Sequence, residues 1–436
     1  MSVKSKEKQE EKTKKGKKGK KKGHRFLKTL VIILVLGAVL VGASVAASAV
    51  TNKGNREKLD GFSAVPYDAQ LVPTTDGFGN VSFVTDRPLK VLQLTDVHIG
   101  GGWMAAKKDA MALNAVAAMV TAEQPDLVIV TGDVAYPVPF QAGTLNNKNS
   151  AELFAELMER LGVYWTLTFG NHDTELYAFY TREDMAAFYQ NRAAYPHCLF
   201  TPGPAEVDGC CNQVISIQNT KGEYTRILIG LDSHSYIDGD FLGAMWKYDN
   251  IHENQVAWYQ KVVADYTAAN AEKGVAGVVK SSLFFHIPLV EYKDAWYEYV
   301  NNGFRDTENV QFVSGEAGEE KKVIFCGIHE DDLFETVCKL GSTDLIFCGH
   351  DHYNNFDIIY KGVHLTYGMS VDYLAYPGIY REGTQRGCTV LTFAPDGTYA
   401  RQTENYYQEK YESVYDKETV TMQTMVPVSE FPAEAE

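Results

Sequence analysis

Five apolar runs along the chain each lead directly into a polar group. In chain order they are PLKVLQLTDVH (88–98), DLVIVTGD (126–133), YWTLTFGNHD (164–173), GVVKSSLFFHIP (277–288) and DLIFCGHDH (344–352), of which the fourth is the least regular. Continuous apolar runs are typical of strands that are buried on both faces of a sheet. The pattern therefore predicts an α/β protein whose polar groups lie just past the carboxyl ends of its strands, where open α/β sheets place their sites.

The polar groups at these strand ends consist mainly of residue types that bind metals. They contain Asp96, His98, Asp133, Asn171, His172, Asp173, His286, His350, Asp351 and His352. Carboxylate and amide oxygens mixed with imidazoles suit a pair of first-row metals, and such a pair suits the hydrolysis of phosphate esters. Gly132, Gly170 and Gly349 precede three of the groups. We expect these glycines to let the backbone turn sharply, so that the next side chain faces the metals.

The ordered set of groups resembles the calcineurin-like metallophosphoesterase family, and the resemblance covers roughly residues 88–393. Within that family the chain is most similar to the short, atypical purple acid phosphatases, through FFHIPLVEY, GHDHYNNF and the later HLTYG. The resemblance implies a layered β-sandwich flanked by helices, with a dinuclear metal site at the carboxyl ends of the strands. It also implies two divalent or mixed-valence metal ions as cofactors, drawn from iron, manganese or zinc.

The same resemblance implies how the ligands divide between the two metals. One metal would be held by Asp96, His98, Asp133 and His352, and the other by Asp133, Asn171, His286 and His350. Asp133 would bridge the pair, because a shared carboxylate offsets the repulsion between two dications. A water bridging the metals would be acidic enough to attack the phosphorus as hydroxide near neutral pH.

The resemblance further implies catalytic roles for two residues that do not bind metal. His172 is expected to protonate or hydrogen-bond the leaving oxygen, and Asp173 is expected to orient the His172 ring. Asp351 is expected to support the histidines on either side of it. His234 also follows an apolar run, in LDSHSYID, and a substrate-facing role is the minor alternative to a structural one.

One position departs from the usual pattern of purple acid phosphatases. The common enzymes have glycine where His98 stands, and they use a tyrosine three residues after the bridging aspartate to bind ferric iron. Tyr136 lies at that offset from Asp133, so this chain has both options. The Asp-x-His spacing alone fills the first metal's shell. We therefore expect His98 to be the ligand, Tyr136 to line the wall and the protein to lack the purple colour.

Charge is divided sharply along the chain. Residues 1–28 contain 13 Lys or Arg and 3 Glu, a net of +10, and the remaining 28 basic and 53 acidic residues give a net of −25. The segment Thr29–Val50 is uncharged, apolar and 22 residues long. A basic tail directly before such a segment is typical of the cytoplasmic flank of a membrane element, so the catalytic part would face outward. The acidic remainder argues against nucleic acid as a partner.

Two interpretations of the apolar segment remain open. Leu30–Gly42 is long enough for the core of a cleavable signal peptide, with Ser44-Val45-Ala46 or Ala47-Ser48-Ala49 as small-residue cleavage sites. The whole of residues 29–50 also has the length of an uncleaved signal anchor, which we favour. The protein is therefore expected in the cell membrane with its domain extracytoplasmic, or secreted if the leader is cleaved.

The predicted organisation has five parts. They are a basic cytoplasmic tail (1–28), a signal anchor or signal peptide (29–50), a linker with amino-terminal strands (51–87), the catalytic domain (88–400), and an edge strand with a flexible tail (401–436). Residues 174–236 are expected to form an insertion with a helix near 182–191 and a hairpin around 219–222. The alternation in ETVTMQTMV (418–426) predicts the edge strand, and the flexible tail follows it.

The sequence thus predicts an exported, membrane-attached, dinuclear metallophosphoesterase that hydrolyses phosphomonoesters, with a small phosphate ester as substrate. A phosphodiesterase or nucleotide hydrolase on the same metal core is the main alternative. A metal-binding scaffold without turnover is a further alternative, although it would have no need of a proton donor such as His172 beside the metals.

Overall fold

The computed structural model describes residues 3–240, 243–319, 323–376 and 386–418, with the side chains of residues 3–25 excepted. Within these residues the strands form two sheets. The nine-stranded sheet contains, in spatial order, β1 (Thr74–Thr75), β2 (Val81–Val84), β6 (Gln213–Gln218), β7 (Tyr224–Gly230), β8 (Lys280–Phe284), β10 (Thr343–Cys348), β12 (Val363–Tyr367), β11 (Asp357–Tyr360) and β9 (Val310–Ser314). The five-stranded sheet contains β14 (Tyr399–Tyr406), β13 (Gly387–Phe393), β3 (Leu89–Leu94), β4 (Leu127–Thr131) and β5 (Trp165–Thr168).

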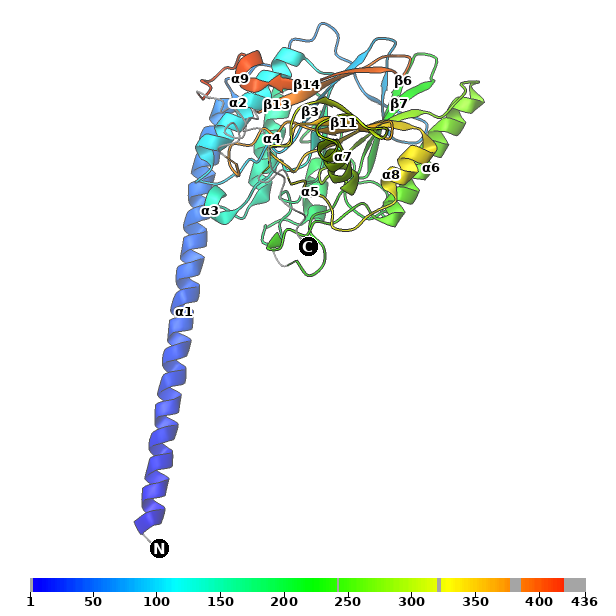
Figure 1. Cartoon of the computed structure of the whole chain (residues 1–436). Helices are drawn as coiled ribbons and strands as arrows, with labels where there is room; N and C mark the ends of the chain where they lie inside the picture. Colours follow the sequence, from blue (N-terminus) through cyan, green and yellow to red (C-terminus); the bar gives the residue numbers. More distant parts are fainter. Residues whose placement is uncertain (1–2, 241–242, 320–322, 377–385, 419–436) are drawn as a thin grey trace.

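Helices cover the outer faces of both sheets (Figure 1). The helices of the described residues are α1 (Val3–Leu59), α2 (Ala106–Glu123), α3 (Pro139–Ala142), α4 (Asn147–Leu161), α5 (Arg182–Tyr189), α6 (Glu253–Glu272), α7 (Val290–Asn301), α8 (Leu333–Leu340) and α9 (Tyr407–Lys410). Side chains of α2 and α4 pack on the five-stranded sheet, and those of α6, α7 and α8 pack on the nine-stranded sheet. The expected α/β sandwich flanked by helices is confirmed.

All five apolar runs form strands, and the strands are buried on both faces. In β4, Leu127 and Ile129 belong to the core between the two sheets, whereas Val128 and Val130 belong to the core beneath α2 and α4. Strands β3 and β10 divide their side chains in the same way between the central core and an outer core. This arrangement explains why the runs are continuously apolar and do not alternate.

The ligand-bearing strands are divided between the two sheets. Strands β3, β4 and β5 run parallel in the five-stranded sheet, and β8 and β10 run parallel in the nine-stranded sheet. Their carboxyl ends meet at one edge of the sandwich. The metal-binding candidates therefore come together from both layers.

The segment predicted to be an insertion forms part of the sandwich. The helix and hairpin are present as α5 and as the antiparallel pair β6 and β7. However, β7 also pairs with β8 and β6 also pairs with β2, so the hairpin lies inside the nine-stranded sheet. Its apolar residues Ile215, Ile217 and Leu228 complete the core between the sheets, which is why this segment is no surface addition.

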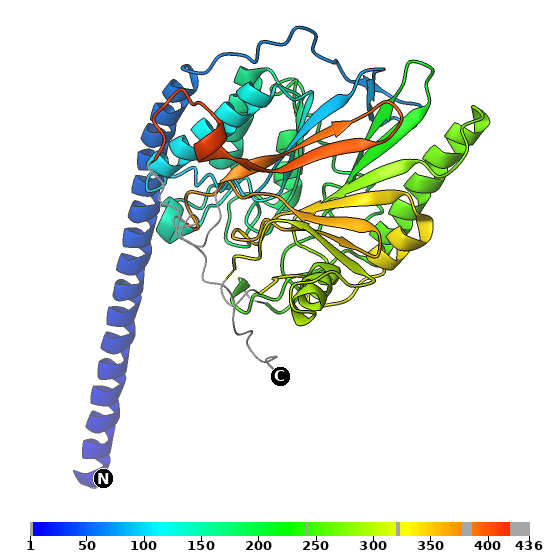
Figure 2. The same ribbon diagram turned by 45° about the horizontal axis from the view of Figure 1, so that its top comes forward.

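Helix α1 is one continuous helix that leaves the domain beside α3 and extends far from it (Figures 1 and 2). Within the described residues, Phe26–Leu59 is one helix that is long and apolar enough to cross a membrane, with a mean hydropathy of 2.8 in its most apolar window. The linker expected from residue 51 is instead helical as far as Leu59. Leu59, Phe62 and Val65 join the core that α2 and α4 form, which holds this end of the helix on the domain.

The carboxyl-terminal part of the described chain contains an edge strand that lies before the predicted one. Strand β14 pairs with β13 at one edge of the five-stranded sheet. The edge strand predicted over residues 418–426 falls almost entirely outside the described residues.

Candidate metal centre

Asp133 follows β4 and lies at the centre of the ligand candidates. Its Oδ2 atom is 3.1 Å from Nε2 of His286 and 3.3 Å from Nε2 of His98. Its Oδ1 atom accepts a hydrogen bond from the backbone N–H of His172 at 2.8 Å. Burial alone would raise the pKa of Asp133, but the adjacent rings of His286 and His172 hold it well below its usual range. The carboxylate is therefore ionised and faces histidines from both sheets.

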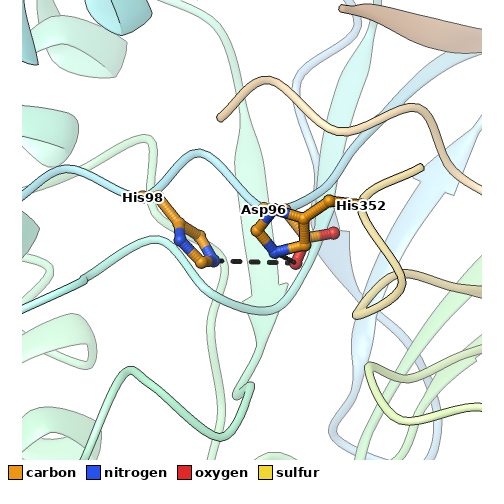
Figure 3. A group of neighbouring side chains, drawn as sticks. All are labelled: Asp96, His98 and His352. Carbon is orange, nitrogen blue, oxygen red and sulfur yellow. Dashed lines mark ion pairs between the residues drawn. The ribbon is translucent and has the colours of Figure 1, made fainter. Parts of the chain in front are cut away.

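Asp96 follows β3 and forms a second centre. Its Oδ1 atom is 3.4 Å from Nε2 of His352 and 3.7 Å from Nε2 of His98. Figure 3 shows both rings close to this carboxylate, with their ion pairs as dashed lines. The backbone N–H of His350 also lies 3.1 Å from Asp96 Oδ2. Because His98 approaches Asp96 and Asp133, it connects the two centres.

Asn171 and His350 complete the group on the side of His286. The amide Oδ1 of Asn171 is 3.1 Å from Nε2 of His286, and its Nδ2 donates to the hydroxyl of Tyr236 at 3.1 Å. The His350 ring meets the His286 ring edge to face, with 5.2 Å between centroids. Burial and the neighbouring His286 hold the pKa of His350 well below its ordinary value, so its ring offers a lone pair.

The donor set fits two metal ions. Two groups of side chains, Asp96, His98 and His352 and then Asp96, Asp133 and His286, each place a ligand atom within 4.8 Å of the others. His286 Nδ1 donates to the carbonyl of Thr131 at 2.8 Å, so its Nε2 lone pair faces Asp133. A metal-binding histidine is held in this way by a partner on its other nitrogen. The buried carboxylates and neutral imidazoles are the ligand types that first-row metals prefer.

Asp372 is a functional candidate that the sequence did not reveal. Its Oδ2 atom is 3.1 Å from Nδ1 of His352, and its Oδ1 atom is 3.8 Å from Nδ1 of His98. The carboxylate also accepts backbone N–H groups of residues 374–376. It therefore fixes the outer nitrogen of one candidate ligand and approaches that of another. The only signal was its place after the apolar run that contains HLTYG.

Backbone conformation aims the candidate ligands. Asp96, His98, Asp133 and His350 have φ values of 50°, 50°, 54° and 78°, in the left-handed region that side-chain-bearing residues rarely adopt. Such conformations cluster at functional sites, where the surrounding structure imposes them. The turn is therefore made largely by the candidate ligands themselves.

Two of the preceding glycines serve a purpose other than the expected turn. Gly132 has a φ of 87°, as expected, whereas Gly170 and Gly349 do not have left-handed φ values. A Cβ atom on Gly170 would lie 2.1 Å from Asp133 Oδ1, and one on Gly349 would lie 1.9 Å from the Thr95 hydroxyl. These two positions lack a side chain because neighbouring groups approach the backbone closely, which corrects the expectation of a sharp turn.

The family model described as Calcineurin-like phosphoesterase matches residues 89–354, more than half of the chain. The chain belongs to this family. As a calcineurin-like phosphoesterase it is a phosphoric ester hydrolase, and its family depends on two metal ions. The matched range contains all seven candidate ligands.

The chain is also similar to individual proteins. The chain is 26% identical over 322 residues to Probable inactive purple acid phosphatase 28 of Arabidopsis thaliana, covering 67% of this chain and 73% of the relative. Phosphatase DCR2 of Saccharomyces cerevisiae is 26% identical over 306 residues, which is 65% of this chain and 47% of the yeast protein. A dimetal phosphatase from Danio rerio, 8% identical, covers 76% of this chain and 99% of its own with a TM-score of 0.44. The resemblance to purple acid phosphatase-like proteins is confirmed.

In this calcineurin-like phosphoesterase a different carboxylate from the expected one meets the His172 ring. Nδ1 of His172 is 2.7 Å from Oε1 of Glu175. Asp173 instead accepts backbone N–H groups of Asp133, Ala135 and Gly170 at 2.8–2.9 Å. The expected ring-orienting role of Asp173 is thus corrected: its side chain organises the Asp133 loop. In the turn at residues 172–175, Glu175 faces the His172 ring, and the adjacent Asp173 does not.

Tyr136 lines the wall of the site. Its ring stacks on the His98 ring with 4.7 Å between centroids, and its hydroxyl donates to Oε1 of Gln141 at 2.8 Å. Burial and, after it, the charge of Asp372 raise the pKa of the Tyr136 hydroxyl. The hydroxyl is therefore a phenol that is engaged with a side chain of α3.

Asp351 and His234 have structural surroundings. Asp351 accepts hydrogen bonds from the Tyr367 hydroxyl at 2.6 Å and from Asn354 Nδ2 at 3.2 Å, so it organises the loop that carries its neighbouring histidines. His234 Nε2 is paired with Gln255 Oε1 at 2.9 Å, and its ring stacks on that of His252. His234 thus contacts the first turn of α6 and the residue just before this helix.

Proposed function

We propose that this phosphoesterase hydrolyses phosphomonoesters outside the cytoplasm while anchored in a membrane by α1. The observation that carries the catalytic part is the convergence of seven candidate ligands on Asp96 and Asp133, with His172 beside them. The His172 side chain is 24% exposed, whereas those of Asp133 and His286 are almost fully buried. His172 is therefore accessible to an entering substrate beside the buried carboxylate.

The residues divide the work as follows. The seven ligands would hold two metal ions, which supply positive charge for the phosphoryl oxygens and activate the attacking water. Glu175 accepts from Nδ1 of His172, so Nε2 is the nitrogen that meets the leaving oxygen and protonates it. Asp173 keeps the Asp133 loop in place. Tyr136 shields the centre from bulk water on the side of α3.

The contacts of α1 support an anchor more than a cleaved leader. Ser48 and Asn52 are buried against the domain, and Asn52 Nδ2 donates to the carbonyl of Gly101 at 2.8 Å. Arg56 is paired with Glu156 at 2.8 Å. Cleavage after Ala46 or Ala49 would interrupt a helix that is held on the domain from residue 44 onward. The basic flank before the apolar segment supports an outward-facing domain.

The experiment that tests this function is a hydrolysis screen. The purified full chain in detergent would be loaded separately with iron, manganese and zinc, and phosphate release would be measured from monoesters, diesters and nucleotides. We expect monoesters to have the highest kcat/KM with at least one metal. Higher values for diesters or nucleotides would favour the alternative hydrolases. Two bound metals without any turnover would favour a metal-binding scaffold, and we expect no turnover of nucleic acid.

A further inference from the structure

Six of the exposed large apolar side chains lie on segments that adjoin the metal centre, and we call these six the rim. It consists of Trp103, Met104, Phe140, Leu176, Phe179 and Trp246. Phe140 is 90% exposed, Leu176 is 74% exposed and Trp246 is 68% exposed. Exposed apolar side chains of this size are unremarkable singly, but a group around one site marks a surface that meets another apolar phase.

Each part of the rim belongs to a segment that touches the metal centre. Trp103 and Met104 follow His98 in the loop after β3. Leu176 directly follows Glu175, the partner of His172, and Phe179 N–H donates to the Leu145 carbonyl just before α4. These four rim residues therefore lie on segments that adjoin His98 and His172.

The other two rim segments are linked to the centre through tyrosines that pack on its histidines. Phe140 lies in α3 beside Gln141, which accepts from Tyr136. Trp246 lies in the loop whose Tyr248 ring packs edge to face on His350, with 4.2 Å between centroids. The apolar side chains thus come from both sheets, as the candidate ligands do.

Helix α1 passes the same edge of the domain. Ser44, Ser48 and Asn52 are four residues apart and share one face of the helix. The Ser44 hydroxyl donates to the carbonyl of Gly143 at the end of α3, and Ser48 Oγ accepts the backbone N–H of Trp103 at 3.2 Å. The helix thus contacts two of the segments that carry rim residues.

The length of α1 sets the level of a membrane surface. A span of about 20 residues crosses the hydrocarbon core, and from Thr29, where the predicted anchor begins, it ends at Ser48. Ser48 contacts Trp103 and lies one turn after Ser44, which contacts the end of α3. In Figures 1 and 2 the rest of α1 extends away from the domain past α3. A bilayer around the helix would therefore face the side of the domain where α3 lies.

The metal centre lies close to that level. Trp103 lies five positions after His98, and a fully extended chain covers at most about 3.6 Å per residue. The backbone of His98 is therefore within about 18 Å of the backbone of Trp103, which contacts α1 at Ser48. Residues 29–436 have a net charge of −25, so electrostatic attraction to anionic lipids does not explain contact with a membrane. Apolar insertion of the rim does.

We infer that the mouth of the metal centre faces the bilayer in which α1 is anchored, that the rim inserts into its interface, and that the substrate is a phosphate monoester carried by a lipid. This inference rests on the proposed function, since it takes the anchor and the phosphatase activity from there. Trp and Tyr side chains favour the interfacial region of a membrane, and Trp103 and Trp246 are placed to occupy it. The lipid brings its phosphate to His172 without leaving the membrane.

The orientation is tested by fluorescence quenching. The full chain would be inserted in phosphatidylcholine vesicles that carry bromine at a shallow or a deep position of the acyl chains. Trp165 and Trp296 are buried and Trp258 is half-buried on α6, so the part of the quenching that is lost in Trp103→Phe and Trp246→Phe belongs to the rim. We expect strong quenching by shallow bromine that falls in Trp103→Phe and Trp246→Phe. An inserted chain without bromine quenching would overturn the inference.

The substrate class is tested with a matched pair of phosphomonoesters. Phosphatidic acid in phosphatidylcholine vesicles and water-soluble glycerol 3-phosphate carry the same ester. At equal bulk concentration we expect the lipid to be hydrolysed at least about tenfold faster, because the membrane raises its effective concentration at the site. Equal rates, or a faster rate for glycerol 3-phosphate, would overturn the lipid substrate.

Variants separate membrane contact from catalysis. Phe140→Ser and Leu176→Ser should lower the rate on phosphatidic acid severalfold and leave the rate on glycerol 3-phosphate unchanged. Val278→Ser is the control, because Val278 is exposed just before the amino end of β8, at the other end of the strand from His286. It should change neither rate. If the metal-loaded wild type hydrolysed neither phosphatidic acid nor glycerol 3-phosphate, the proposed function would be contradicted. The fluorescence quenching would still decide the orientation at the membrane.

Discussion

Nδ1 of His172 lies 2.7 Å from Oε1 of Glu175, and the Glu175 side chain is almost completely buried. A buried carboxylate at this distance fixes both the rotation of the imidazole and the nitrogen that carries its proton. The pair gives His172 one orientation relative to Asp133, whose Oδ1 accepts the His172 backbone N–H. Glu175 is thus a positioning residue for the proposed proton donor.

The first prediction concerns this pair. Glu175→Gln should lower kcat by about ten- to a hundredfold, the usual loss when the partner of a functional imidazole is removed, while KM changes little. Glu159→Gln is a matched control, since it breaks a similar pair with His197 Nδ1 at 2.6 Å away from the site. An equal effect of the two variants would contradict the positioning role.

The second prediction concerns the bridging position. Asp133→Ala should lose metal together with activity, because both centres depend on this carboxylate. His172→Ala should keep its metal and lose about a hundred- to ten-thousandfold in turnover, with a smaller loss on substrates that have acidic leaving groups. Elemental analysis of the two variants checks both statements. Two metals per chain in Asp133→Ala would show that the bridge is misassigned.

The third prediction separates His98 from Tyr136 as ligands. The iron-loaded protein should show no intense visible tyrosinate band, and Tyr136→Phe should keep most of its activity, because the Tyr136 hydroxyl is engaged with Gln141. Visible spectra of the wild type and the variant are the measurement. A purple band that disappears in Tyr136→Phe would move the chain to the tyrosine-ligated type of site.

The fourth prediction concerns Asp372. Asp372→Asn should lower metal affinity by about ten- to a hundredfold, because His352 loses the carboxylate on its outer nitrogen. Competition with a chelator of known affinity measures the effect. Asp396→Asn is the control, since Asp396 also accepts a backbone N–H, from Thr398 at 3.0 Å in an exposed turn. Unchanged affinity in Asp372→Asn would mean that the ligands are held by other contacts.

The fifth prediction concerns Glu123, whose carboxylate lies 2.6 Å from Lys410 Nζ and 2.7 Å from Lys90 Nζ. Partial burial opposes ionisation, but these ammonium groups lower the pKa of Glu123 from 4.5 to about 2. In the unfolded chain Glu123 takes up a proton near its ordinary pKa of 4.5, which is higher than its pKa in the folded protein. The ionised carboxylate therefore stabilises the fold fully above about pH 4.5, and this stabilisation is lost as the pH falls toward 2.

We therefore expect the wild type to exceed Glu123→Gln in free energy of unfolding at about pH 6, and this difference to shrink toward about pH 3. Urea denaturation of both proteins with metals removed is the measurement, because protonation of the metal-binding groups then cancels between them. A difference that stays constant across this range would refute the assignment.

The sequence predicted the strands that carry the candidate ligands, because a strand that is buried on both faces has a continuous apolar run, as in β4. It also predicted that Asp96, Asp133 and His286 would meet. It did not reveal Asp372 or Glu175, because a residue that acts through a hydrogen bond to another side chain has no characteristic spacing from it. Adjacent carboxylates such as Asp173 and Glu175 can be distinguished only when the turn between them is known.

Local sequence patterns also could not show that the hairpin within residues 174–236 belongs to the nine-stranded sheet. Strands β6 and β7 form a hairpin, as expected, but their partners β2 and β8 are distant along the chain. Pairing between distant strands depends on the complete set of apolar faces and leaves no mark within the segment. The conformation of the linker region was hidden for a similar reason, since Leu59 and Phe62 are held by α2 and α4.

The candidate ligands also have a topological consequence. Asp96 and His98 follow the five-stranded sheet, whereas His350 and His352 follow the nine-stranded sheet, and 254 residues separate Asp96 from His350. A metal that ties such positions together closes a very large ring of chain, and loop-closure entropy assigns about 5 kcal/mol to a cross-link of this size. The metal ions would then cross-link the five-stranded and the nine-stranded sheets. Chelation would loosen the sandwich as a whole, so that metal supply would govern the lifetime of the folded protein as well as its turnover.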